Sequence, residues 1–261
     1  MIRGQDSHMK QYKKNYELKN VAKDRLEGKY KGAILILLLS NVIAWIARLF
    51  INSIAANTAN SVYAMSGSTS AAQAVTILFD VVLLAANILL GVMSAGIALY
   101  FLNIACGQQP FTKDLFYGFQ NDSKKALVIS AAVTLCNTVC LGPGQYLSQN
   151  FLNTRDGKWV LPALLATAVG LCIYIPISLG IAMSFFLMLD FPERSGKEIL
   201  QLCWRLMKGN RKRLFLLELS FLPLMLLCIL SFGIGFLWLE PYMQMTYTYF
   251  FLDLMNPVEK S

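Results

Sequence analysis

Long apolar runs are the feature that most restricts what this chain can fold into. A helix needs about 20 mostly apolar residues to cross the hydrocarbon core of a bilayer. Six stretches have that character or come close to it: 33–55, 77–103, 126–141, 159–189, 214–232 and 236–254. Only 15% of the residues are charged, against about 25% in a soluble domain. The sequence therefore predicts an all-α, polytopic membrane protein whose six transmembrane helices form one domain over residues 33–254.

The sixth stretch, 236–254, is more polar than the others. Glu240 and Pro241 lie near its start, and a glutamine and two threonines follow. An interfacial or re-entrant segment is the alternative interpretation, which would leave five transmembrane helices. The glycines at 231–235 favour a tight hairpin between the last two stretches, because glycine adopts the backbone angles that a short turn needs.

Basic residues define the expected orientation, because Lys and Arg in short loops stay on the cytoplasmic side of a membrane. With six spans, one face of the protein collects 20 of the 23 basic residues. Both termini are therefore predicted to be cytoplasmic, and anionic lipid headgroups are the expected partners of this face. The positive charge follows the membrane face and accompanies no recognisable nucleic-acid-binding fold, so no nucleic-acid partner is expected.

Two segments are predicted to be amphipathic helices on the cytoplasmic surface. One is the basic N-terminal segment 10–32, and the other, 195–210, has apolar residues at the three-four spacing of a one-sided helix. The basic residues before the fifth span are expected to anchor it at lipid headgroups. These residues are Lys208, Arg211, Lys212 and Arg213.

The two ends of the chain carry little structural information. Residues 1–9 are similar to a vector-derived remnant that ends at a natural Met9, which would make the single histidine, His8, foreign. Residues 255–261 are expected to form a cytoplasmic tail. Without a native imidazole, most hydrolase and metalloenzyme classes are disfavoured.

Four stretches together resemble an uncharacterised family of bacterial integral membrane proteins, domain of unknown function 975. They are NYELKNVAKDRLEGKYKGAILILLL at 15–39, DLFYGF at 114–119, LMKGNRKRLFLLELSF at 206–221 and SFGIGFLWLEPYMQMTYTYFFLDL at 231–254. The resemblance implies a multi-pass helical protein of a bacterial cytoplasmic membrane and assigns no catalytic residue. The outer loop at 141–159 is longer than expected for that family.

Ionisable residues inside apolar stretches are costly in a bilayer and therefore mark candidate functional positions. Arg48, Asp80 and Glu240 are expected at one depth near the outer leaflet, where Arg48 would pair with one or both carboxylates. Such a cluster is either an interhelical ion pair or part of a substrate or ion pathway. Glu218, inside the fifth span, is expected to bond to the basic residues before it or to reach the headgroups.

Uncharged residues suggest a groove and two packing contacts. Asn41, Asn87 and Ser94 lie in the first two spans and need polar partners inside the bundle, so a wet groove between these helices is possible. Small residues four apart let helices approach closely in lipid. Two such pairs are Gly91 with Ala95 and Gly180 with Ser184.

No motif for phosphate binding, metal binding or a nucleophile elbow is present. No catalytic residue, metal ligand or cofactor is therefore expected. The preferred hypothesis is a non-enzymatic scaffold, assembly factor or protective partner of another membrane protein, or a homo-oligomer. A small transporter or channel with a polar path near Arg48 and Asp80 is the main alternative. A lipid-modifying enzyme that uses Asp80 and Glu240 as its acid and base is a third.

Overall fold

The computed structural model describes residues 12–256 and contains only helices and their connections over that range. The predicted remnant at 1–9, with His8 and Met9, lies outside the described residues, as does 257–261 of the predicted tail. The all-helical prediction is confirmed for the part of the chain that the structure describes.

Five helical segments are long and apolar enough to cross a membrane, and five of the six predicted stretches overlap them. The segments are Tyr30–Ser66, Thr69–Ala105, Ser123–Leu152, Gly157–Asp190 and Arg211–Leu230. The first is the unbroken helix α2 (Tyr30–Ser66) and the third lies in α6 (Ser123–Thr154). The other three segments are interrupted. The second consists of α3 (Thr69–Gly91) and α4 (Met93–Ala105), and the fifth of α10 (Arg211–Leu219) and α11 (Leu222–Leu230). The fourth consists of η2 (Gly157–Trp159), α7 (Val160–Ile181) and α8 (Ser184–Asp190).

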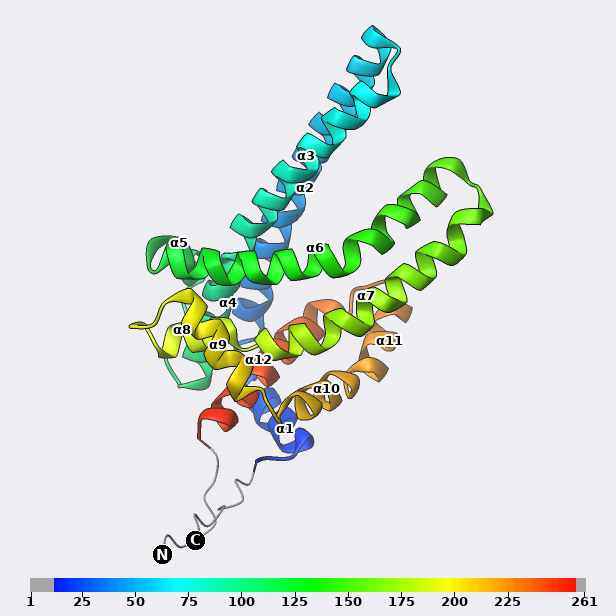
Figure 1. Cartoon of the computed structure of the whole chain (residues 1–261). Coiled ribbons are helices and arrows are strands. Elements are labelled where there is room, and N and C mark those ends of the chain that lie inside the picture. Colours follow the sequence, from blue (N-terminus) through cyan, green and yellow to red (C-terminus); the bar gives the residue numbers. More distant parts are fainter. Residues whose placement is uncertain (1–11, 257–261) are drawn as a thin grey trace, which may run out of the picture.

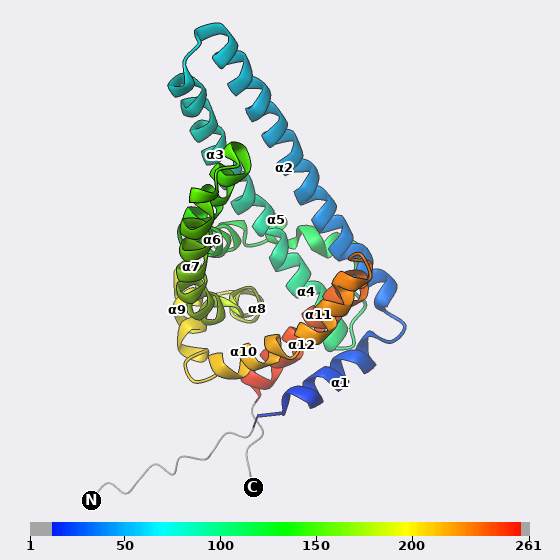
Figure 2. The same cartoon turned by 90° about the vertical axis from the view of Figure 1, so that its right-hand side faces the viewer.

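Two helical hairpins extend away from the rest of the protein as arms (Figures 1 and 2). One is formed by α2 and α3, the other by α6 and α7. With 37 residues, α2 is about 55 Å long, whereas the hydrocarbon core of a bilayer is about 30 Å thick. The sequence predicted that the first span ends near residue 55 and the third near 141, but both helices continue. The polar segments beyond those points stay helical because each pairs with its antiparallel neighbour in the arm.

Helix α12 (Phe236–Met255) packs against α1 (Asn15–Leu26), α2, α4 and α11. It is not among the five membrane-span candidates, so the sixth transmembrane helix stays a prediction. Its C-terminal half is largely buried, including Thr246 and Thr248. Their hydroxyls donate to the carbonyl oxygens of Tyr242 at 2.7 Å and Gln244 at 2.9 Å. The polar residues that lower the apolarity of this helix are therefore accommodated inside the protein.

Each of the two segments predicted as surface helices contains a shorter helix, and the buried apolar side chains of that helix face other helices. Leu18, Ala22 and Leu26 of α1 are buried where α1 packs on α12 and α4. In α9 (Gly196–Leu206), Ile199 and Cys203 are buried where α9 packs on α6, α7 and α8. The amphipathic spacing in these segments therefore serves intramolecular packing, and their position on the membrane surface stays a prediction.

A short connection, η1 (Thr112–Phe116) and α5 (Tyr117–Gln120), joins α4 to α6 and packs tightly on α4. A Cβ atom on Gly96 of α4 would lie 2.3 Å from the backbone oxygens of Asp114 and Leu115. Only glycine therefore permits this approach. This close approach holds α4, the second half of the α3–α4 segment, against η1 and α5.

Candidate functional site

Two of the three charged residues predicted to cluster, Arg48 and Glu240, instead bind amide side chains. Arg48 on α2 donates from Nε to Oδ1 of Asn87 on α3 at 2.9 Å. Asn41 on α2 donates from Nδ2 to Oε2 of Glu240 on α12 at 3.2 Å. Within residues 12–256, no ion pair joins Arg48 to Asp80 or to Glu240, so the predicted direct pairing is not formed.

Helix register explains why the charges stay apart. Asn41 and Arg48 are seven residues apart on α2, as are Asp80 and Asn87 on the antiparallel α3. Seven residues make two helical turns, or about 10 Å along one face. Asp80 therefore lies two turns beyond the Arg48–Asn87 contact, and Glu240 two turns before it. The separation of roughly 20 Å between the carboxylates is too large for one acid-base pair.

Arg48 and Asp80 are exposed on an arm whose other exposed residues are mostly apolar. Beside Arg48, the side chains of Trp45 and Phe50 are 62% and 67% exposed. Beside Asp80, Leu78 is 63% exposed. This arm therefore presents an arginine and an aspartate, two turns apart, within an apolar surface.

A second polar site lies where the three interrupted segments approach one another. The chain breaks its helices at Val92 between α3 and α4, near Met183 between α7 and α8, and at Phe221 between α10 and α11. A cavity of about 240 Å³ lies beside these breaks, lined by residues of α4, α8, α10 and α12 and by the α7–α8 connection. We name it the central cavity. Among its lining residues are Ser94, Glu218, Gln244 and Tyr247.

The polar side chains of the central cavity have unused hydrogen-bonding capacity. Within the described chain, the side chains of Ser94, Glu218, Gln244 and Tyr247 make no hydrogen bond of normal geometry to another protein group. Glu218 also lacks an ion pair within this range, which corrects the prediction that it bonds to the basic residues before it. Sequence reasoning singled out Glu218 and Ser94 separately, but it did not bring them together and did not assign Gln244 or Tyr247 of α12 to a site.

The predicted groove is divided among three environments. Asn41 contacts α12, Asn87 contacts α2, and Ser94 lines the central cavity. Neither Arg48 nor Asp80 lines that cavity. The predicted groove residues therefore do not form one continuous polar path from Arg48 and Asp80 into the central cavity.

The small residues singled out in the sequence lie at close helix contacts. A Cβ atom on Gly91 would lie 2.2 Å from Oγ of Ser130 on α6, and one on Gly180 would lie 2.5 Å from the Trp204 ring of α9. The remaining two, Ala95 and Ser184, are fully buried. Each of the four positions thus lies where a larger side chain would have little room.

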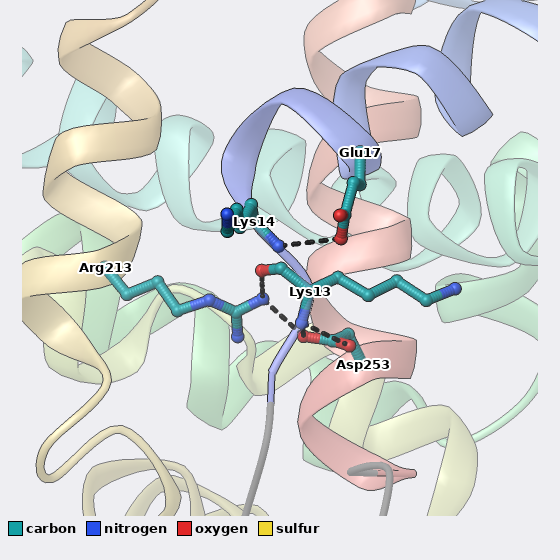
Figure 3. Close-up of polar contacts among 5 residues, drawn as sticks. All are labelled: Lys13, Lys14, Glu17, Arg213 and Asp253. Atoms are coloured by element: carbon teal, nitrogen blue, oxygen red, sulfur yellow. Dashed lines mark hydrogen bonds and ion pairs between the residues drawn. The ribbon is translucent and has the colours of Figure 1, made fainter.

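The basic residues at the start of α10 and just before it do not all have the same surroundings. Lys208 and Lys212 are exposed. Arg213 instead forms an ion pair with Asp253 of α12 and donates to the carbonyl oxygen of Lys13 at 2.9 Å (Figure 3). The guanidinium of Arg211 lies 3.8 Å from the centre of the Trp204 ring. The headgroup-anchor prediction therefore requires correction for Arg213, whose charge is used within the protein.

Asp253 joins three parts of the chain at this junction. Its side chain is 3% exposed, and it accepts from the backbone N–H of Lys13 at 3.2 and 3.3 Å as well as from Arg213. Next to it, the backbone N–H of Lys14 donates to Glu17 at 3.0 Å (Figure 3). This bond, together with a second one from the Tyr16 hydroxyl, lowers the pKa of the Glu17 carboxyl. Sequence reasoning did not single out Asp253. An acid within an apolar stretch was the available signal, but its partner Arg213 lies 40 residues away in the sequence.

Metal-binding and family comparisons give limited functional information. In residues 12–256, no group of three or more His, Cys, Asp or Glu residues could hold a metal ion. Residues 145–257 match the family model described as protein of unknown function, DUF975. The resemblance is confirmed over these residues, which include the stretches 206–221 and 231–254 but not 15–39 and 114–119. No curated protein and no solved structure matches the chain.

Proposed function

We propose that this chain is a non-enzymatic membrane protein that binds another membrane protein through its α2–α3 arm. Its role would be that of a scaffold, an assembly factor or a protective partner. The family match assigns no activity, so the proposal rests on the arm itself. The observation that carries it is the exposure of Arg48 and Asp80 among apolar side chains.

Lipid is an unfavourable environment for these two groups. An arginine or aspartate at the centre of a transmembrane helix costs about 2.5–3.5 kcal/mol on insertion scales. The bond from Arg48 to Asn87 uses only one of the five N–H donors of the guanidinium. A partner helix with an acceptor for Arg48 and a donor for Asp80 would offset this cost. A second copy of the chain meets the same requirement if Arg48 of one copy pairs with Asp80 of the other.

We further propose that the protein lies in a bacterial cytoplasmic membrane with both termini in the cytoplasm. The distribution of 20 of the 23 basic residues on one face supports this orientation. The exposed side chains of Lys208 and Lys212 would then contact anionic headgroups. The arms would extend toward the outer face, where their helices continue beyond the apolar runs.

Site-specific photocrosslinking tests the arm as a binding surface. A photoreactive residue at Phe50, near Arg48, is expected to give one protein adduct of defined mass in native membranes. Arg48→Leu combined with Asp80→Leu should largely abolish that adduct, because the polar pairing that fixes the partner is removed. An adduct of twice the mass of the chain would identify a second copy as the partner.

The control is a photoreactive residue at Leu226 on α11, which is 62% exposed and lies outside both arms. It should not give the same adduct. Adducts to lipid alone at Phe50, or a protein adduct that persists unchanged in the double variant, would contradict the proposal.

A small transporter or channel is the second candidate function, and the central cavity favours it. Interrupted transmembrane helices often form substrate sites in transporters, because their ends leave backbone groups free inside the membrane. Here three interrupted segments approach one cavity that contains an acid. A transport path would therefore pass Glu218 and not Arg48 and Asp80.

A further inference from the structure

We propose that the central cavity binds a small organic ammonium cation, with the carboxylate of Glu218 as its counter-ion. This inference deepens the second candidate function by naming a class of substrate. Its biological role rests on the proposed transport function, but binding itself does not, because a protein can bind a ligand without transporting it. The partner-binding role of the α2–α3 arm is independent of it.

Among the described residues, Glu218 is the only ionisable carboxylate that lines the central cavity, and no cation of this part of the chain balances its charge. No Lys, Arg or His nitrogen within residues 12–256 lies within 4.0 Å of it. Arg213, five residues earlier, is paired with Asp253. The ammonium group of Lys19 donates to the backbone oxygen of Ser220 at 2.8 Å and lies over the Phe221 ring. A cationic ligand would supply the missing charge.

The remaining lining residues favour a cation with an apolar exterior. Ser94, Gln244 and Tyr247 provide oxygen acceptors that are free within the described chain. Tyr247, Phe185 and Phe186 provide aromatic rings, which attract ammonium groups through their negative faces. No basic residue of the described range 12–256 lines the cavity, so an anionic ligand such as a phosphate or a carboxylate would have no counter-ion from these residues.

The size of the cavity restricts the ligand further. Its volume of about 240 Å³ lies below the range of about 300–1,000 Å³ typical for drug-sized ligands. A cation with a few heavy atoms fits this space, whereas a nucleotide or an intact phospholipid does not. Methylated ammonium ions combine the required charge, size and apolar surface.

Isothermal titration of the full chain in zwitterionic lipid nanodiscs tests the site with tetramethylammonium chloride. The protein is expected to bind tetramethylammonium, and Glu218→Gln should weaken binding at least tenfold. Tyr247→Leu should weaken it by a smaller factor through loss of one ring. Glu240→Gln is the matched control, since it changes a carboxylate of the neighbouring helix that does not line the cavity, and it should leave binding unchanged.

Two comparisons separate the proposed chemistry from alternatives. Tert-butanol, a neutral molecule of similar shape, should not bind, and sodium chloride should not displace tetramethylammonium at equal concentration. No binding of tetramethylammonium to the wild-type chain would overturn the proposal. Equal binding by a Glu218→Gln variant with an unchanged melting temperature would also overturn it. A Glu218-dependent site for Na⁺ alone would exclude the ammonium assignment.

Flux measurements test the transport function separately from the ammonium-binding site. Proteoliposomes that contain the wild-type chain are expected to take up radiolabelled tetramethylammonium, and the Glu218→Gln variant should not. Binding without flux would remove the transporter hypothesis and retain the ammonium site. Flux that is independent of Glu218 would retain transport and remove the site.

Discussion

At the scale of single residues, Asp253 is a buried charge whose partners come from two other parts of the chain. It receives hydrogen bonds from the backbone of Lys13 and from Arg213, whose side chain is 17% exposed. Because Asp253 itself is 3% exposed, removing either partner leaves a buried charge without its counter-ion. This junction holds the start of α1, the start of α10 and the end of α12 together (Figure 3).

Arg213→Met and Asp253→Asn are each expected to lower the free energy of unfolding by roughly 2–4 kcal/mol, between the values for exposed and buried ion pairs. The double variant should be less destabilised than the sum of the two, since both changes remove one interaction. Thermal and denaturant unfolding in detergent would measure this coupling. Lys212→Met, an exposed neighbour, should have no measurable effect. Additive losses would show that the two charges stabilise the fold independently.

At the scale of elements, the α6–α7 arm depends on backbone contact. A Cβ atom at Gly170 of α7 would lie 2.2 Å from the backbone oxygen of Cys140 on α6. Gly170→Ala must therefore push the two helices apart, and we expect a loss of about 1–3 kcal/mol, as for other overpacked sites. A lower melting temperature in detergent would show it. Val169→Ala, at a 60% exposed neighbouring position on the same helix, should change stability by less than about 0.5 kcal/mol. Equal melting temperatures for the two variants would contradict close packing at Gly170.

The elements also show which parts of the fold the sequence could predict. Hydrophobicity is a local property, so the apolar core of α2 was found without knowledge of its neighbours. Its extension to Ser66 was missed, because the polar residues there remain helical only through pairing with α3. The register between α2 and α3 could not be predicted from the sequence either. Arg48 contacts Asn87 and not Asp80, because the turn near residue 67 determines which positions of the two helices lie side by side. Both sites depend on long-range contacts that local patterns do not encode.

At the scale of the whole molecule, the two ends of the described chain lie together. The backbone N–H of Lys13 donates to Asp253, so the start of α1 and the end of α12 lie on the same side of the protein (Figures 1 and 2). Five membrane crossings alone would separate these residues across a bilayer. With the five candidate spans as crossings, this contact predicts that α12 returns the chain to its starting side. Since the C-terminal half of α12 is surrounded by protein, it can do so without the apolarity that a lipid-facing helix needs.

We therefore predict that residues near both ends are accessible from one side of the membrane and that the tips of both arms are accessible from the other. Single cysteines introduced by Lys14→Cys and Asn256→Cys, in a chain whose six native cysteines are replaced, should react with a membrane-impermeant maleimide only after intact cells are opened. Ser66→Cys and Asp156→Cys, at the tips of the two arms, should react in intact cells. All four positions are exposed, so a difference in labelling reports sidedness and not burial. If Lys14→Cys and Asn256→Cys reacted from opposite sides, α12 would not be a crossing, and the Lys13–Asp253 contact could not exist in the membrane.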